Sequence, residues 1–267
     1  MDITGENLGW DVPGNKTITL MSGYSYISED PNDEWSGRGV GIMGMIVIGS
    51  GTRNVTFTCH GSGTYTEGLP DPRLLLYDTG QQVIGFTSGN GTSFTYPLSG
   101  GGTVGHSYTV VLSGGSLSDK GFGSIVAEIS AQGGADVVQA SYRGLVGYGS
   151  EILSTKFAYT GYQSTITCLG KGPTITDYFG DSLKTIEDPA IGLYDTRDIL
   201  IDYNNDWATN KTALSGSNIN WTAGLSAVEA ILWNTLTPGS YYCTMQPNKG
   251  LPGGIGLVEV YLYTEPQ

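Results

Sequence analysis

Two acidic clusters contain the residues whose types and spacing could do chemistry. Residues 30–35 and 202–207 share the pattern Asp-x-Asn-x-acid-Trp, with an oxygen-bearing side chain at every second position. Loops wrap Ca²⁺ with oxygens at alternate positions, because this ion takes about six to eight oxygen ligands. The candidate calcium ligands are Asp30, Asn32, Glu34, Asp202, Asn204 and Asp206.

The same clusters have a purely structural interpretation. Neither is an EF-hand, because the glycine at the sixth loop position and the glutamate at the twelfth are absent. Asp and Asn side chains also accept hydrogen bonds from nearby backbone N–H groups in turns, and the adjacent Trp can cover a sheet edge. The sequence leaves calcium binding and an Asx-rich turn both open.

Motifs for catalysis are absent. The two histidines, His60 and His106, belong to no His-Glu-x-x-His motif, and no serine has glycine two positions before and after it. Residues 39–44 match GxGxxG by letters, but an apolar run follows them where a dinucleotide site needs a helix. We therefore expect no enzyme, and we expect glycines within a buried strand at residues 39–49.

The charge balance limits the partners. The chain of 267 residues has 12 basic and 25 acidic residues, for a net charge of −13. Nucleic-acid binding depends on Lys and Arg, and anionic membranes attract the same residues, so neither partner is expected. Divalent cations, glycans and surface proteins remain compatible. No run approaches the roughly 20 apolar residues of a membrane span.

The three cysteines are Cys59, Cys168 and Cys243. They are too few for a disulfide scaffold and too widely spaced for a CxxC site. Cys59 and Cys168 occupy similar Thr-Cys strand contexts, and Cys243 falls where the first half of the chain has Val110. A Cys168–Cys243 disulfide and three buried thiols are both compatible with this pattern, and both leave Cys59 unpaired.

Export is inferred rather than seen. The first five residues have neither a basic nor an apolar signal region, so we expect a mature or recombinant form. Asn-x-Thr glycosylation sequons, which would be used only in a secreted protein, occur at Asn15, Asn54, Asn90, Asn210 and Asn220.

Self-similarity is the strongest signal in the sequence, and it fixes the architecture that positions these residues. Five landmarks recur in the same order: Arg38-Gly39 and Arg143-Gly144; Thr-rich strands ending at Cys59 and Cys168; residues 71–78 and 188–195, both Asp-Pro-x₃-Leu-Tyr-Asp; Ser-Tyr strands at 107–112 and 240–245; and closing strands with Glu128 and Glu259. The chain therefore contains two copies of one module. Asp78 and Asp195 are expected to begin equivalent hairpin turns.

Each copy has the pattern of a sandwich of short strands. Alternation such as Thr-Val-Thr-Phe-Thr at residues 54–58 predicts strands with one buried face, and Gly- and Pro-rich turns separate them. Helical periodicity is weak throughout, with residues 222–236 as the one ambiguous stretch. The predicted fold class is all-β, with two tandem antiparallel β-sandwich domains of jelly-roll-like form.

The second copy resembles a known group of modules. Its Asp-Pro segment at 188–195, its Asn-Asp-Trp loop at 205–207 and its Val-Glu-Val-Tyr strand at 258–261 are similar to the β-sandwich modules at the C-termini of secreted bacterial proteins, including the pre-peptidase C-terminal group. The first copy lacks the Asn-Asp-Trp loop. The resemblance implies an exported, non-catalytic jelly-roll-like module used for attachment, binding or display.

We predict an N-terminal arm (1–20) and two modules (21–133 and 134–267), with a strand at 17–20 that could pair with a sheet edge. The expected function is that of an extracellular or cell-surface structural or adhesive protein that self-associates by strand addition. The alternative is an accessory module of a secreted enzyme that binds a glycan or a protein.

Overall fold

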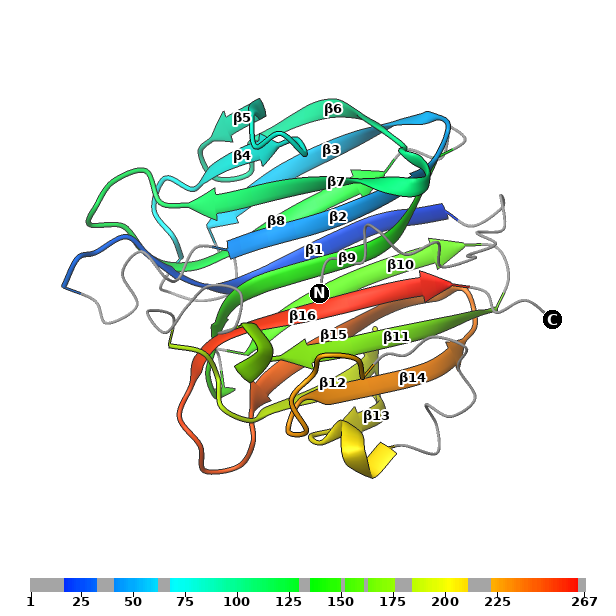
Figure 1. Ribbon diagram of the computed structural model, residues 1–267. Coiled ribbons are helices and arrows are strands. Elements are labelled where there is room, and N and C mark those ends of the chain that lie inside the picture. The colour runs from blue at the N-terminus through cyan, green and yellow to red at the C-terminus, as the bar shows by residue number, and fades with distance from the viewer. Residues whose placement is uncertain are drawn as a thin grey trace.

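The chain folds into two antiparallel eight-stranded sheets that enclose one hydrophobic core (Figure 1). A computed structural model describes residues 17–32, 41–61, 68–129, 135–149, 152–160, 163–175, 184–210 and 222–263. The predicted all-β sandwich class is confirmed. Within these residues, no helix has the length and apolar character needed to cross a membrane.

Each sheet contains strands from both ends of the sequence. Sheet A consists, in spatial order, of β13 (Leu200–Asn204), β12 (Pro189–Asp195), β15 (Gly239–Pro247), β10 (Leu153–Thr160), β1 (Thr17–Ser28), β8 (Lys120–Ile129), β3 (Thr52–Gly61) and β6 (Ser93–Ser99). Sheet B consists, in spatial order, of β14 (Ala230–Leu236), β11 (Ser164–Lys171), β16 (Gly254–Tyr263), β9 (Ala135–Val146), β2 (Gly41–Gly49), β7 (Gly102–Ser113), β4 (Arg73–Tyr77) and β5 (Val83–Ser88). A short 3-10 helix, η3 (Trp207–Asn210), follows β13.

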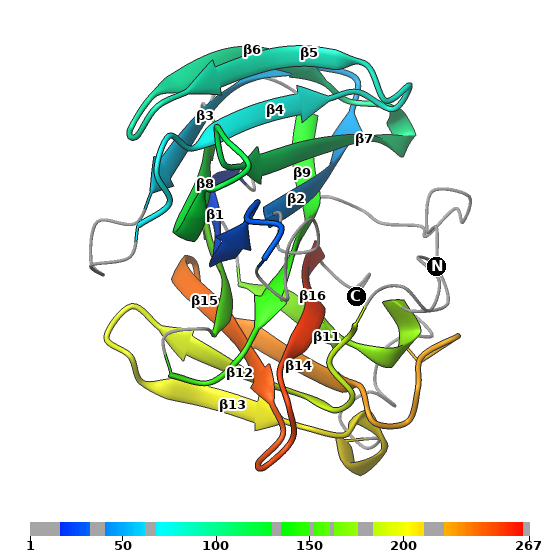
Figure 2. The ribbon, with the colours of Figure 1, turned by 90° about the vertical axis from the view of Figure 1, so that its left-hand side faces the viewer.

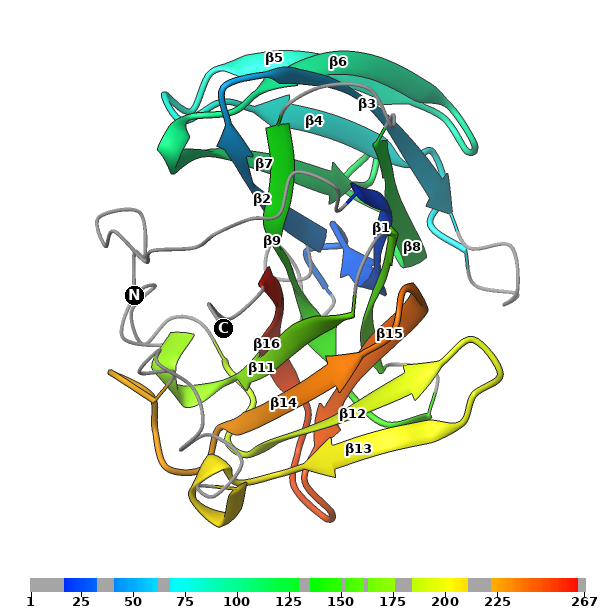
Figure 3. The same ribbon diagram turned by 90° about the vertical axis from the view of Figure 1, so that its right-hand side faces the viewer.

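The strand order makes each repeat a jelly roll. The first repeat contributes β1-β8-β3-β6 to sheet A and β2-β7-β4-β5 to sheet B. The second contributes β9-β16-β11-β14 to sheet B and β10-β15-β12-β13 to sheet A, which is the same order with the sheets exchanged. Figures 2 and 3 show the first repeat above the second. The predicted jelly-roll form is confirmed.

The two repeats meet by edge pairing in the middle of both sheets. Strand β1 pairs with β10, and β2 pairs with β9, so each sheet runs on from one repeat into the other. Residues 17–20, predicted as part of a separate arm, are the start of β1, which has neighbours on both sides and lies at no outer edge. Residues 1–16 and the predicted boundary at 133–134 lie outside the described residues.

Tyr142 of β9 fills the space between the sheets at this junction. Its side chain is fully buried, and its hydroxyl lies 3.4 Å from Ser25 Oγ. A Cβ atom added at Gly23 would lie 1.9 Å from the Tyr142 ring, and one at Gly41 would lie 2.2 Å from its hydroxyl. The ring therefore requires glycine on both neighbouring strands, because interiors are close-packed.

Strand β2, predicted as a buried strand, alternates between buried and half-buried positions. Met43, Met45 and Val47 point into the core, and the residues between them are half-buried. Gly41 and Gly44 of the GxGxxG letters lie within this strand, as expected, while residues 39 and 40 lie outside the described part of the chain.

Strand registers test the proposed landmarks of the duplication. Leu76 faces Val110 as Leu193 faces Cys243, so Val110 and Cys243 occupy equivalent places, as predicted. Asp78 Oδ1 accepts a hydrogen bond from Gln82 N at 2.9 Å, and Asp195 Oδ1 accepts one from Ile199 N at 3.1 Å. The two Asp residues therefore begin equivalent turns, as predicted.

Three landmarks were wrong. Leu69 N donates to Phe122 O and Ile186 N donates to Ile255 O, each two residues before the paired Asp71 and Asp188, so Phe122 and Ile255 are equivalent. Counting along the strands from there, Glu259 corresponds to Val126 and Glu128 to Tyr261, and the registers make Cys168 the counterpart of Phe57 instead of Cys59. By the same alignment Arg143 lies in β9, the counterpart of β1, whereas Arg38 precedes β2 and lies outside the described residues. Short similarities of this kind can recur without equivalence because one alternating strand resembles another.

We predict that Gly23→Ala destabilises the protein, because the added methyl group would overlap the ring of Tyr142. Overpacking a core costs about 1–3 kcal/mol. Chemical denaturation monitored by tyrosine fluorescence measures the loss. Ser22→Ala, at the adjacent residue on the opposite side of β1, is the matched control, and equal stabilities of the two variants would contradict this role of Tyr142.

Candidate functional site

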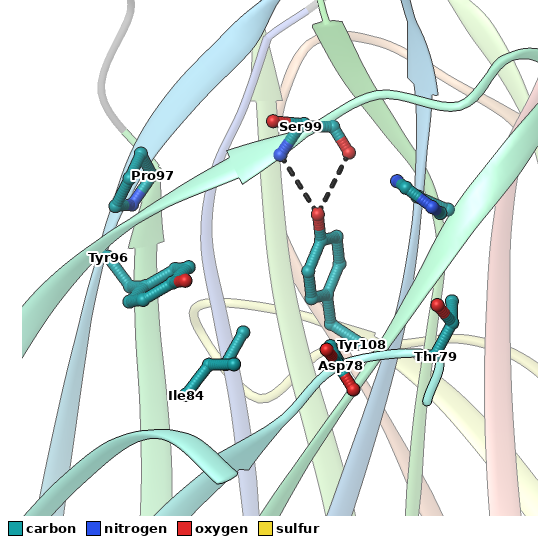
Figure 4. A pocket seen from close by; sticks show the side chains of 8 residues that line it. Asp78, Thr79, Ile84, Tyr96, Pro97, Ser99 and Tyr108 are labelled. Atoms are coloured by element: carbon teal, nitrogen blue, oxygen red, sulfur yellow. Dashed lines mark hydrogen bonds between the residues drawn. The ribbon is translucent and has the colours of Figure 1, made fainter. Parts of the chain in front are cut away.

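The candidate site lies at the end of the first repeat, where the sandwich is open between its outermost strands. Strand β5 is the last strand of sheet B and β6 is the last strand of sheet A. A cavity of about 250 Å³ lies beside them (Figure 4). Its lining residues are Asp78, Thr79, Ile84, Tyr96, Pro97, Ser99, His106 and Tyr108.

The turn between β4 and β5 forms one part of the rim. Asp78 holds this turn through Oδ1, and Gln81 within it has a positive φ of 59°. The second repeat has the same turn, in which Asp198 has a φ of 62°. The turn uses only one carboxylate oxygen of Asp78 among the described hydrogen bonds, so the other oxygen can accept a hydrogen bond from a ligand.

Tyr108 forms the fixed inner wall. Its hydroxyl accepts a hydrogen bond from Ser99 N at 3.0 Å and donates one to Ser99 O at 3.1 Å. These two bonds hold the ring across the start of the β6–β7 connection. His106 packs edge-on against it, with the ring centroids 5.9 Å apart, and the imidazole itself is exposed.

Apolar and polar groups line different parts of the cavity. In Figure 4, Tyr96, Pro97 and Ile84 lie on one side of Tyr108, and Thr79 lies on the other. Aromatic and aliphatic surface beside a few convergent polar groups is typical of small-molecule sites. The arrangement can bind a small ligand that has one apolar face and a polar rim.

At the corresponding end of the second repeat, side-chain hydrogen bonds join the two outermost strands. Asp202 Oδ2 accepts a hydrogen bond from Asn234 Nδ2 at 2.8 Å, and Asn204 Oδ1 accepts one from Ile231 N at 3.0 Å. The register places these two β13 residues where β5 has Gly85 and Thr87. Side chains thus join the edge strands β13 and β14 in the second repeat, whereas Phe94 packs over Gly85 in the first.

These bonds engage the predicted calcium ligands of the second cluster. Asn204 also donates from Nδ2 to Asp206 O at 3.0 Å, and Asp202 Oδ1 accepts a bond from Tyr203 N at 2.8 Å. This is the Asx-type bonding of the structural interpretation. Among the described residues, no group of three or more His, Cys, Asp or Glu side chains could hold a metal ion. Calcium binding by Asp202, Asn204 and Asp206 stays a prediction.

The first cluster is described only in part. Asp30 Oδ1 accepts a hydrogen bond from Asn32 N at 2.9 Å, and Asp30 Oδ2 lies 3.4 Å from Lys120 Nζ. The bond from the Asn32 backbone, followed by smaller contributions that include Lys120, lowers the pKa of Asp30 below its usual value. Glu34 lies outside the described residues.

The glycosylation sequons are also only partly described. Asn54 on β3 and Asn90 in the β5–β6 turn are exposed. Asn90 Oδ1 accepts a hydrogen bond from Gly61 N at 3.0 Å. Asn210 ends helix η3, and its side chain is not described. Asn15 and Asn220 lie outside the described residues, and glycosylation stays a prediction.

Cys168 of sheet B and Cys243 of sheet A are joined as a disulfide across the core. Both side chains are fully buried. Cys59 is a buried free thiol, with Sγ 3.3 Å from Gly89 O. Burial raises the pKa of this thiol, which disfavours the reactive thiolate.

Sequence reasoning did not find the cavity residues. In the sequence His106 belongs to no catalytic motif, and Tyr96 and Ile84 are ordinary strand residues that give no sign of a site. The one available signal was the position of His106 two residues before Tyr108, which places both side chains on one face of a strand. The cavity itself depends on four segments that meet only in the fold.

Comparisons with known proteins give little further information. No family model and no curated protein matches the chain. A fucolectin from the serum of the striped bass Morone saxatilis is 9% identical, covers 84% of this chain and 80% of its own, and has a TM-score of 0.21. A β-porphyranase of glycoside hydrolase family 86 from the human gut bacterium Bacteroides plebeius is 11% identical, covers 96% of this chain and 38% of its own, and has a TM-score of 0.22. These scores support no inference about the ligand.

We predict that the Cys168→Ala variant is less stable than the wild type, because the disulfide closes a sequence separation of 75 residues. The expected loss is about 4 kcal/mol. Thermal unfolding with and without reductant measures it. Reductant should lower the transition of the wild type and of Cys59→Ala, but not that of Cys168→Ala. A wild type that does not respond to reductant would contradict the disulfide.

Proposed function

We propose that the protein is an extracellular, non-catalytic binding protein that holds a glycan residue in the cavity beside β5 and β6. The observation that carries the proposal is the lining of this cavity, where Tyr96 and Ile84 lie near Asp78 and the exposed His106. The jelly-roll frame is compatible with many functions, so the argument rests on the site and not on the fold.

The chemistry of the lining suits a sugar ring. A pyranose has a face of C–H groups that packs on aromatic and aliphatic surface, and a rim of hydroxyls that needs donors and acceptors. Tyr96 and Ile84 supply the surface. The carboxylate of Asp78 accepts hydrogen bonds, and the imidazole of His106 can donate or accept them.

The size of the cavity limits the ligand. A volume of about 250 Å³ lies below the ~300–1,000 Å³ of common small-molecule sites. We therefore expect one terminal sugar residue to enter, with the rest of the glycan outside. The net charge of −13 favours neutral glycans over anionic ones.

Two features support an extracellular location within this proposal. Disulfides persist in oxidising compartments, and Cys168 and Cys243 form one. Asn54 and Asn90 present their sequons at exposed positions, where an oligosaccharide could be attached.

We predict that Tyr96→Ala and His106→Ala each weaken glycan binding by about tenfold or more, because each removes a contact worth about 1–2 kcal/mol. A glycan array identifies the ligand, and calorimetry measures the affinity of each variant. Tyr203→Ala, at an exposed tyrosine on β13 of the other repeat, is the matched control. Glycan retention that is unaffected by both cavity variants would overturn this site, and an empty array would overturn the proposed ligand class.

A second candidate function is self-association through β13, the outer edge of sheet A. Ile199, Leu200, Ile201 and Tyr203 are 52%, 50%, 39% and 46% exposed, in a stretch of five consecutive residues. Strand β13 pairs only with β12 among the described strands and is the outermost strand of sheet A, the position at which another strand can add. At the opposite end of the sheet β6 contains Pro97, which lacks an N–H group and discourages edge pairing.

We predict that Leu200→Lys and Ile201→Lys abolish any oligomer that forms through this edge, because charged residues block strand addition. Light scattering coupled to size-exclusion chromatography measures the mass over a range of protein concentrations. Association should increase with salt, because salt screens the repulsion between copies of charge −13. A wild-type monomer under all conditions would exclude this candidate.

A further inference from the structure

A buried group of ionisable side chains lies on the outer face of sheet B in the second repeat. Lys171 Nζ lies 2.7 Å from Glu259 Oε2, and both side chains are only 10% exposed. Tyr261 donates a hydrogen bond from its hydroxyl to the same oxygen at 3.1 Å. The proposed glycan site does not involve these residues, which belong to the other repeat.

The strand register fixes the geometry. Strands β11 and β16 are neighbours, with Lys171 opposite Leu257 and Leu169 opposite Glu259. Lys171 and Glu259 therefore stand diagonally on one face of adjacent strands, within reach of long side chains. Their contact is set by the sheet and does not depend on a loop.

A second carboxyl group lies beside this pair. Glu229 is fully buried, and its Oε1 accepts hydrogen bonds from Gly172 N at 3.2 Å and Thr174 N at 2.7 Å. Among the described residues, its Oε2 has no hydrogen-bond partner. Burial raises the pKa of Glu229, and the hydrogen bonds from Thr174 and Gly172, followed by the charge of Lys171, oppose this shift only in part. Oε2 is therefore the atom at which Glu229 can give or take up a proton.

Apolar side chains exclude water around the group. Leu169, Ile231 and Tyr261 form a small buried cluster against which Trp207, Leu225 and Trp233 pack. A low dielectric strengthens the attraction between the ammonium and the carboxylate, which holds Nζ against the carboxyl group.

The fold does not require this arrangement. By register, the place of Glu259 in the first repeat belongs to Val126, and the place of Lys171 belongs to His60. A buried ion pair is also a weak source of stability, because apolar residues of similar volume often serve as well or better. Neither the fold nor stability therefore accounts for the buried Lys171–Glu259 pair, and a chemical role would.

We propose that Lys171 and Glu259 condense to an intramolecular amide bond, with Glu229 as the proton carrier. The ammonium proton passes to the Glu259 carboxylate, which gives a neutral amine and a neutral acid. Nζ attacks Cδ of Glu259, the Nζ–Cδ bond forms, and the C–O bond to the hydroxyl breaks. Glu229 gives its proton to the leaving hydroxyl and takes one from Nζ, so that one water leaves and Glu229 ends protonated. No oxidant or cofactor is consumed.

The surrounding groups favour each part of this step. Register holds the amine against the carboxyl group, which provides the proximity that a bimolecular condensation lacks. The hydroxyl of Tyr261 donates to Oε2 of Glu259, the oxygen that Nζ contacts, and so holds the carboxyl group in place for the attack. Expulsion of water from an apolar surrounding opposes the reverse hydrolysis.

Intact-mass spectrometry of the full chain, denatured and with its disulfide reduced, tests the proposal. The expected mass is that of the sequence less one water, and trypsin should release a branched peptide that joins the segments around Lys171 and Glu259. Lys171→Arg keeps the positive charge but cannot condense in this way, so it should have its full sequence mass. Glu259→Gln should lose ammonia instead of water and reach the same final mass as the wild type.

The Glu229→Gln variant tests the proton carrier while Lys171 and Glu259 stay unchanged. This variant keeps an acceptor for Gly172 N and Thr174 N but cannot exchange a carboxyl proton, so it should fold with the wild-type circular dichroism spectrum and retain its full mass. The exposed pair Lys120–Asp30, at 3.4 Å, is an internal control that should yield no branched peptide. A wild type of full sequence mass would overturn the proposal, as would a branched peptide that persists in Glu229→Gln.

Discussion

The architecture depends on strand pairing at the junction of the two repeats. Because β1 pairs with β10 and β2 with β9, the two sheets have no break between the repeats, and a single core runs through both. Tyr142 occupies the centre of this junction, and glycine at positions 23 and 41 makes room for it. The remaining free strand edges lie at the two far ends of the molecule, where the cavity and the exposed β13 strand are found.

Duplication gave the same frame to both repeats, and local substitutions then made their ends different. The turns after β4 and β12 have the same aspartate hydrogen bond and a positive-φ residue at the same position. Gly85 and Asp202 occupy equivalent strand positions but have different neighbours. Phe94 packs over Gly85, whereas Asp202 accepts a hydrogen bond from Asn234. Likewise Val126 and Glu259 are equivalent in register, and only the second is part of a buried ionisable group.

The sequence was sufficient for the local features of this fold. Period-two alternation identified β3, the apolar run at residues 39–49 identified β2, and the paired Asp-Pro segments located the equivalent turns after Asp78 and Asp195. The exchange of sheets between repeats could not be predicted, because pairing partners far apart in sequence leave no local pattern. The same holds for the cavity, where Asp78, Tyr96 and His106 converge from separate segments, and for the register that separates Glu128 from Glu259.

The junction has the geometry of an isologous dimer contact within one chain. The first strand of each repeat pairs with the second strand of the other, so a two-fold axis relates the two contacts. A single-repeat ancestor could have formed a homodimer through these same edges, and its folded state would then have depended on protein concentration. Fusion of two such repeats into one chain would make the encounter intramolecular, which would remove that dependence and allow each half to change without disturbing an identical partner.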